Sequence, residues 1–311
     1  MKKIPRSVQI TVISSILFVF FFYLSFPYVV LKELVSSEIL NRTGFSVRME
    51  DLSPSLPLGI KATTIKMTPP GSSKSFELAT AYAHISILSL LIGNLGIDLE
   101  FVSAPKGSLQ LDIQYSLFSL MTGSQSLPHK IRMIARDFKL DDVSHFALNT
   151  MAAGEAVNPL LQPVLKGMGL NAKLDGQIKL NLDYQTPSQS SGMVDITLKD
   201  ALLKLSDPSL GLPDQKFSAA RIKMNAENGL VKIDDISKFV SDEISLEFKG
   251  KVNLKKPISG SELDLNIPLK ISGGLREKFG FLLDAMAGGV PRNGELKINL
   301  KGPLATFTTT F

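Results

Sequence analysis

Cysteine and tryptophan are absent from the 311 residues, and histidine occurs only at His84, His129 and His145. A chain without cysteine forms no disulfide, binds no zinc or iron–sulfur cluster through thiolates, and has no thiol nucleophile. Histidine is the side chain most used for acid–base catalysis and metal binding, so its scarcity weakens an enzymatic interpretation. These absences exclude several of the commonest catalytic chemistries.

Recognisable catalytic patterns are missing as well. No serine lies in a Gly-x-Ser-x-Gly turn, no glycine-rich loop carries the lysine of a phosphate-binding loop, and the histidines lack metal-ligand spacing. Asp141-Asp142 and Asp234-Asp235 are adjacent carboxylates, but such pairs usually accept backbone hydrogen bonds in turns. We therefore expect no catalytic, cofactor-binding or metal-binding residues, and a protein that is not an enzyme.

Long runs of one charge are also absent. The formal net charge is +5, but Lys2, Lys3 and Arg6 precede the first acidic residue. Without these three, the 34 basic residues fall to 31, against 29 acidic ones. Such a nearly neutral body has no basic patch for nucleic acid, so we expect no nucleic-acid partner.

One long apolar segment is present near the start of the chain. No charged side chain occurs from Ser7 to Leu31, over 25 residues, and about 20 residues suffice for a helix to span a bilayer. A secretory signal peptide would have a shorter apolar run and a cleavage site of small residues, which is missing here. The sequence predicts an uncleaved, single-pass anchor with its basic amino terminus in the cytoplasm and the rest of the chain exported.

A short helix is expected directly after the anchor. Leu34, Val35 and Ile39 follow helical spacing between Lys32 and Thr43, and Gly44 is suited to end the helix. This segment either continues the anchor and lies on the membrane, or is the first core helix of the exported domain.

From Phe45 onward, apolar and polar residues alternate, which is typical of half-buried β-strands. Asn228-Gly229 favours a two-residue hairpin turn, and this turn places position 226 opposite 231 and position 224 opposite 233. Two strands with clean alternation supply a candidate apolar groove face, formed by Ile178, Leu180, Leu182, Leu263, Leu265, Ile267 and Leu269. An apolar face of this kind has to close on itself, pack against protein, or hold an apolar ligand.

Helical patterns are few. Apolar stripes from Leu275 to Met286 and from Pro159 to Met168 predict helices that cap the ends of the sheet. The strand pattern is interrupted for longest between residues 141 and 168, where we expect a boundary. The predicted organisation is a cytoplasmic tail (1–7), the anchor (8–31), a juxtamembrane helix (32–44), a first β-rich half (45–140), an irregular or helical connector (141–168) and a second β-rich half (169–311).

The fold class follows from these patterns. We predict a mainly β protein with a single N-terminal transmembrane helix, followed by a long, curved antiparallel sheet with a few capping helices. Because two helices cannot cover so many strands, the sheet is expected to be open or a split barrel.

Three segments carry a resemblance to a known family. They are the strand from Phe45 to Leu52 with Ser53-Pro-Ser-Leu-Pro-Leu-Gly-Ile-Lys-Ala after it, the segment Leu170-Asn-Ala-Lys-Leu-Asp-Gly-Gln-Ile-Lys-Leu, and the segment Asn293-Gly-Glu-Leu-Lys-Ile-Asn-Leu-Lys-Gly-Pro-Leu. With the anchor before them, these resemble the GspN proteins of type II secretion systems and the broader AsmA-like group of β-rich periplasmic proteins. The resemblance brings no catalytic residues with it.

The resemblance implies a bacterial inner-membrane protein with a periplasmic β-sheet domain. The leading hypothesis is a non-catalytic component of a type II protein secretion system that acts through contacts with other secretion-apparatus proteins. The alternative is an AsmA-like lipid-handling protein that holds acyl chains in an apolar groove. A tethered ligand-binding protein is a third hypothesis.

Overall fold

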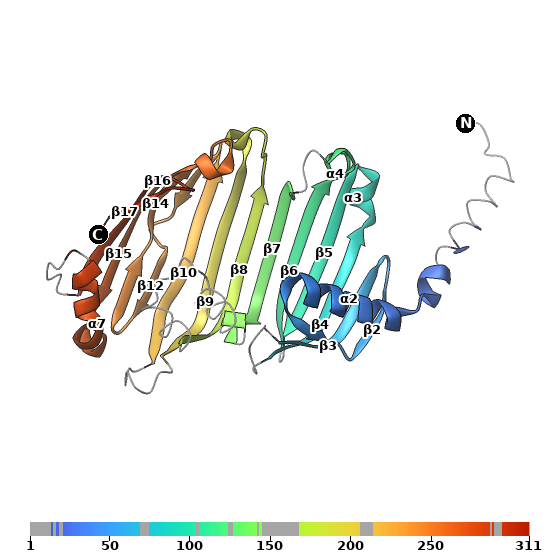
Figure 1. The fold of residues 1–311 in the computed structure, drawn as a ribbon, viewed down its shortest axis with the longest axis horizontal. Coiled ribbons are helices and arrows are strands. Elements are labelled where there is room, and N and C mark those ends of the chain that lie inside the picture. The colour runs from blue at the N-terminus through green and yellow to red at the C-terminus, as the bar shows by residue number, and fades with distance from the viewer. Residues whose placement is uncertain are drawn as a thin grey trace. The chain divides into compact units, whose positions relative to one another are not determined.

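A computed structural model describes residue 14 and residues 17–18, 21–68, 75–103, 106–123, 127–141, 143–144, 168–205, 214–286, 288 and 294–310. The chain divides into two compact units, Met1–Ile85 and Ser86–Phe311. Each unit is built on antiparallel strands with few helices, so the predicted mainly β, antiparallel fold is confirmed (Figure 1).

The first unit consists of helix α2 and a small antiparallel sheet. Strand β3 pairs with β1 and β2 along one edge and with β4 along the other. Helix α2 lies against β1 and β2 (Figure 1). The elements are α2 (Tyr28–Thr43), β1 (Ser46–Arg48), β2 (Asp51–Ser55), β3 (Gly59–Thr68) and β4 (Phe76–Ser86).

Helix α2 contains the short helix expected from Lys32 to Thr43, and begins at Tyr28. Proline disfavours helical backbone in the residue before it, so Pro27 separates α2 from the helical stretch over residues 21–25. At the other end Gly44 adopts a φ of 75°, and its N–H bonds the carbonyl oxygen of Leu40 at 2.8 Å. The helix therefore ends where the sequence predicts, but starts earlier.

The predicted anchor, residues 8–31, is described only in part, because its first half lies largely outside the described residues. Among the residues that are described, none belongs to a helix both long and apolar enough to cross a membrane.

The second unit is an antiparallel meander. Its strands pair in chain order from β5 to β10, and β10 then pairs with β11 and β12, which are two parts of one broken strand. Strands β13 and β14 form the next broken strand, followed by β15, β16 and β17. The first strands are β5 (Asn94–Ser103), β6 (Gly107–Ser116), β7 (Lys130–Lys139), β8 (Met168–Asn181), β9 (Ser191–Leu205) and β10 (Gln215–Glu227). The later ones are β11 (Leu230–Ile233), β12 (Lys238–Ser241), β13 (Ile244–Glu247), β14 (Lys249–Asn253), β15 (Glu262–Ile271), β16 (Glu295–Pro303) and β17 (Thr308–Thr310).

Helical segments with described bounds accompany these strands. Two short helices precede β5 and follow β6, two single turns lie at strand connections, and one longer helix follows β15. They are α3 (Ile87–Leu91), α4 (Leu117–Thr122), η1 (Pro187–Gln189), η2 (Ile258–Gly260) and α7 (Gly273–Met286). Helix α7 contains the predicted stripe from Leu275 to Met286. The other predicted helix lies outside the described residues except for Met168, which begins β8.

The Asn228-Gly229 hairpin has the predicted register. Both residues have positive φ, 51° and 73°, as a type I′ turn requires. Met224 lies opposite Ile233, and Ala226 lies opposite Val231. This prediction is confirmed, because a two-residue turn leaves only one way to align the strands beside it.

The boundary between compact units differs from the expected division of the chain. Strands β7 and β8, on either side of the expected connector 141–168, pair with each other from Lys130 opposite Asn181 to Lys139 opposite Lys173. The long connection thus returns the chain to the neighbouring strand, and contacts cross the expected boundary. The units meet in the chain at Ile85 and Ser86 instead. Most of the connector itself lies outside the described residues.

Candidate apolar binding face

One face of the second unit carries two continuous rows of aliphatic residues across ten strands, here called the open rows. The first row is Ile97, Ile113, Ile131, Leu180, Gly192, Ala226, Val231, Val252, Leu263 and Gly302. The second row is Leu99, Leu111, Met133, Ile178, Val194, Met224, Ile233, Gly250, Leu265 and Leu300. Every residue in them is half-buried.

The structure places the predicted groove residues on this face but not side by side. Leu180 and Leu263 belong to the first open row, and Ile178 and Leu265 to the second, with four strands between them in each case. Leu182 follows β8, and its N–H bonds the carbonyl oxygen of His129 at 2.7 Å. The remaining two predicted residues, Ile267 and Leu269, lie further along β15.

Sequence reasoning missed how far the face extends. Strands β5, β6, β7, β9, β10, β11 and β14 contribute to the same rows, although the candidate residues came from two strands only. The period-2 pattern of those strands was the available signal. It identifies an apolar side for each strand, and the antiparallel pairing then brings all these sides together.

Three β-bulges keep the face apolar toward the other end of the strands. Register shifts occur in β7 after Ala135, between β8 and β9 near residue 200, and between β10 and β12 near residue 218. Each bulge inserts one residue and so reverses which side the following residues face. Asp137 and Asp200 adopt positive φ there, 45° and 51°. Phe138 and Ala201 are consequently buried, although each breaks the alternation of its strand.

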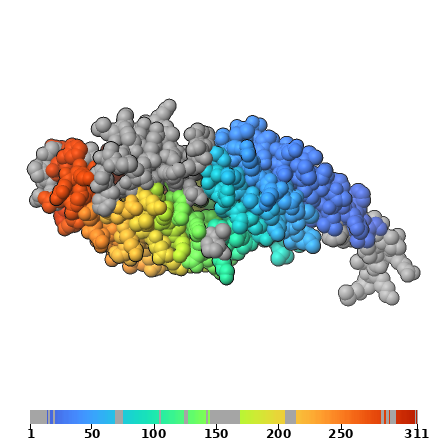
Figure 2. Space-filling view, turned by 90° about the horizontal axis from the view of Figure 1, so that it is seen from below, coloured from blue at the N-terminus to red at the C-terminus, as the bar shows by residue number. Residues whose placement is uncertain are grey.

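Beyond the bulges the face is covered, and this part is here called the closed end. Ala172, Ala201 and Ala220 form a buried cluster there, and Ile271 and Leu296 form a second. Residue pairings connect the two clusters through Phe239, Leu246 and Leu269. Phe279 of α7 packs on the second cluster, so this helix covers the β15–β16 corner of the face (Figures 1 and 2).

The opposite face of the sheet is polar and carries ion pairs between neighbouring strands. Arg221 donates two hydrogen bonds to the Asp195 carboxylate, at 3.0 and 2.8 Å, and these bonds hold the pKa of Asp195 below its ordinary value. Lys199 contacts Asp175 at 2.6 Å and Asp137 at 3.2 Å. The sheet therefore has one hydrated, charge-paired face and one aliphatic face.

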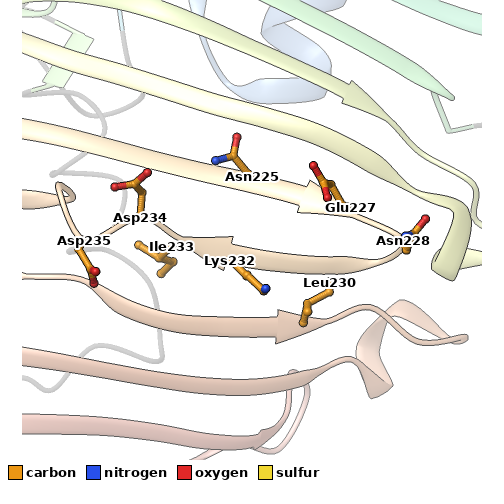
Figure 3. A pocket seen from close by; sticks show the side chains of 8 residues that line it. All are labelled: Asn225, Glu227, Asn228, Leu230, Lys232, Ile233, Asp234 and Asp235. Carbon is orange, nitrogen blue, oxygen red and sulfur yellow. The ribbon is translucent and has the colours of Figure 1, made fainter.

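A hollow with a volume of about 740 Å³ lies beside the Asn228-Gly229 hairpin (Figure 3). Both acidic and basic side chains line it, with Lys232 between Glu227 and Asp235. Asp234, which also lines it, contacts Lys223 at 3.6 Å. The described residues that line this hollow include no histidine, serine or threonine, so they do not supply a nucleophile and a base of the kinds that work together in hydrolases.

The first unit contains a polar cluster that the sequence did not reveal. His84 Nε2 lies 2.8 Å from the Ser55 hydroxyl, and the His84 ring stacks on Tyr82 with centroids 6.2 Å apart. The Tyr23 hydroxyl accepts a hydrogen bond from the Ser55 N–H at 2.9 Å and donates to backbone carbonyl oxygens of the β2–β3 turn. A catalytic triad needs an acidic group behind the histidine, and no carboxylate bonds His84 within the described residues. The cluster fixes the turn to the residues that precede α2.

The other histidines add no site. His129 is half-buried and directly precedes β7. Its pKa is lowered mainly by burial and, to a smaller extent, by the positive charge of Lys130. His145 lies outside the described residues. The described part of the chain contains no group of three or more His, Asp or Glu side chains that could hold a metal ion.

Comparison of the chain with known protein families, with curated proteins and with solved structures finds no match.

Proposed function

We propose that this protein is a non-catalytic, membrane-anchored β-sheet protein that binds acyl chains along the open rows. The observation that supports this most strongly is the pair of aliphatic rows that stay half-buried across ten strands. Monomeric soluble proteins rarely expose contiguous apolar surface on this scale unless it binds something. With about 4.8 Å between neighbouring strands, the rows extend over roughly 45 Å.

The composition of the open rows favours a hydrocarbon over a protein as the bound partner. Both rows contain only Ile, Leu, Val, Met, Ala and Gly. Protein interfaces rely on a few Trp, Tyr and Arg anchors with directional hydrogen bonds, and none of these lies in the rows. An acyl chain forms no hydrogen bonds, so a continuous aliphatic surface is sufficient to bind it.

The location proposed with this function is the bacterial inner membrane. The segment 8–31 would anchor the chain, the basic amino terminus would lie in the cytoplasm, and the curved, open AsmA-like sheet would lie in the periplasm. A reporter enzyme active only outside the cytoplasm, fused after Phe311, should be active and stay with the membrane fraction. A shortened, soluble product would contradict the anchor.

A second candidate function is a component of a type II protein secretion system that acts through protein contacts. Besides the resemblance to GspN proteins, the short edge strand β17 favours it. Thr308–Thr310 pair with β16, and within the described residues no strand pairs with the other edge of β17. A partner protein could extend the sheet there by adding a strand.

One experiment separates the two candidates. A photo-crosslinking amino acid placed at Leu265 in the full-length protein is activated in cells grown with radioactive phosphate, and the adducts are separated by mass. Acyl-chain binding predicts a labelled phospholipid adduct at Leu265 and at Ile178. The matched control is Asn266, the neighbour of Leu265 on the polar face, where no lipid adduct should form.

The same experiment can contradict the leading proposal. Adducts of one discrete protein at Leu265, without labelled lipid, would favour the secretion component. Equal lipid labelling at Leu265 and Asn266 would show nonspecific contact with the membrane.

A further inference from the structure

Two segments of the second unit repeat the same short pattern. Ser86-Ile-Leu-Ser-Leu-Leu-Ile-Gly and Ser116-Leu-Phe-Ser-Leu-Met-Thr-Gly each contain a serine, two apolar residues, a second serine, a leucine, a further apolar residue and a final glycine. They form α3 and α4 with the residues that cap them. We call these two helices together the apolar tip.

Strand pairing places both helices at one end of the β5–β6 hairpin. Asn94, the first residue of β5, lies opposite Ser116, the last of β6. In addition, the Leu117 N–H bonds the carbonyl oxygen of Gly93 at 3.1 Å. Figure 1 shows α3 and α4 together at that end of the strands, whereas α7 lies at the opposite end.

The polarity of the tip is inverted relative to an ordinary surface helix, which faces water with its polar side. Five large apolar side chains point into solvent: Leu88 is 77% exposed, Leu91 77%, Ile92 75%, Phe118 75% and Met121 86%. Ser89, in contrast, is buried, and its hydroxyl lies 3.0 Å from that of Ser86. In the tip a serine side chain is therefore buried, while large apolar side chains face the solvent.

No charge accompanies this apolar surface. Between Glu77 and Asp98, and again between Asp112 and Lys130, no Asp, Glu, Lys or Arg occurs. The rim of a protein interface usually supplies charged groups, which are lacking in both segments. An uncharged surface matches a hydrocarbon environment.

The backbone of the tip is hydrogen-bonded internally, as an apolar environment requires. The hydroxyls of Ser86 and Ser116 accept hydrogen bonds from the N–H groups of Ser89 and Ser119, each at 3.4 Å. At the carboxyl ends, the Gly93 N–H bonds the Leu90 carbonyl oxygen at 3.1 Å, and the Gly123 N–H bonds that of Leu120 at 3.3 Å. The tip can therefore leave water without exposing these donors.

From these observations we propose that the apolar tip inserts into the interfacial region of a phospholipid bilayer. The tip combines inverted polarity, absence of charge and internal capping. A bilayer requires all three features, whereas a protein groove would not, so together they favour a bilayer as the environment of the tip. Lys130 begins the strand next to the tip and is exposed, a position from which its amine can reach phosphate headgroups. This inference does not depend on acyl-chain binding by the open rows.

The test uses the absence of cysteine, because a single introduced cysteine carries the only label. Leu91→Cys and Phe118→Cys are each labelled with an environment-sensitive fluorophore in the full-length protein, which is reconstituted into vesicles of phosphatidylethanolamine and phosphatidylglycerol. Spin-labelled lipids then quench any fluorophore that lies in the bilayer. The matched control is Phe281→Cys in α7, because Phe281 is also apolar and 71% exposed but lies at the opposite end of the strands.

We expect blue-shifted emission and quenching roughly twofold stronger at both tip positions than at Phe281. Adding Leu91→Glu and Met121→Glu to the Phe118→Cys protein should reduce quenching to the Phe281 level. Leu304→Glu, at the same end of the strands but outside the tip, should leave it unchanged.

Two results would overturn the proposal. Tip labels quenched no more than the Phe281 label would show that the tip stays in water. Blue-shifted tip labels that lipid quenchers cannot reach would show that a protein surface covers the tip instead. Neither result would affect phospholipid adducts at Leu265, so failure of this inference is distinguishable from failure of the proposed function.

Discussion

The closed end and the open rows belong to the same face of the same sheet, yet they differ in burial. Small alanines are buried at the closed end, where Ala201 has an exposed fraction of 0%, whereas Leu180 and Leu265 in the open rows are half-buried. Hydrophobicity alone would rank these residues in the opposite order. Burial on this sheet is decided by what covers a position rather than by its side chain.

The line of bulges marks the change between the two regions. On one side of it the alternation is regular and the face stays open, and on the other side Phe138 and Ala201 are buried. A bulge bends the strand and increases its twist. The closed end can therefore serve as the core of the unit, which leaves the open rows available for a ligand.

The largest expected effect comes from the same substitution in both regions. Leu296→Ala removes a side chain that is only 2% exposed and should destabilise the protein by about 2–5 kcal/mol. Leu265→Ala, on the adjacent strand in an open row, should cost about 1 kcal/mol, because its side chain is already partly hydrated. Thermal unfolding followed by circular dichroism measures both. Equal losses would remove the distinction between the regions.

A second comparison tests the border at the bulges with two glycines of β8. Gly176 has a φ of 142°, and a methyl group there would overlap the carbonyl oxygen of Asp195. Gly176→Ala should therefore cost about 1–3 kcal/mol. Gly169 has open space around it, so Gly169→Ala should be neutral or slightly stabilising. Similar melting temperatures for the two variants would show that the backbone at the border is not constrained.

A smaller effect is expected on the polar face behind the rows. Because Arg221 lowers the pKa of Asp195 below 3.8, the folded state favours the ionised carboxylate. The stability from this pair is present above the ordinary pKa and is lost as the pH falls through the lowered one. Both side chains are partly exposed, so Asp195→Asn should cost about 0.5–1 kcal/mol near neutral pH. The loss relative to the parent should shrink below about pH 4. A loss independent of pH would exclude the charge as its cause.

The smallest effect concerns His129, next to Leu182 at the border of the open rows. Burial lowers its pKa below 6.5, so the folded state favours the neutral ring. The unfolded chain binds the proton more readily, and stability therefore falls as the pH decreases through 6.5 toward the lowered value. His129→Gln should have a flatter melting-temperature profile over this range. Parallel profiles for His129→Gln and the parent would contradict this prediction.

Local features of the fold could be predicted from the sequence because neighbouring residues determine them. Alternation assigned an apolar side to each strand, Asn228-Gly229 set the register of one hairpin, and Gly44 marked the end of α2. Each of these depends on backbone preferences within a few residues. The predicted anchor at residues 8–31 also follows from a local property, its lack of charge, and stays a prediction.

Only the tertiary structure determines how these local features are aligned with one another and which side chains remain exposed. The open rows exist because pairings between strands align residues as distant as Leu99 and Leu300, and no local pattern encodes that alignment. The same holds for the contact of Ser55 with His84, and for the outward orientation of Leu91 and Phe118. Exposure depends on which distant segments cover a residue. Alternation alone would place Ala201 on the polar side of its strand, and only the bulge in the folded sheet brings it to the face of Leu180 and buries it there, while Leu180 stays half-buried.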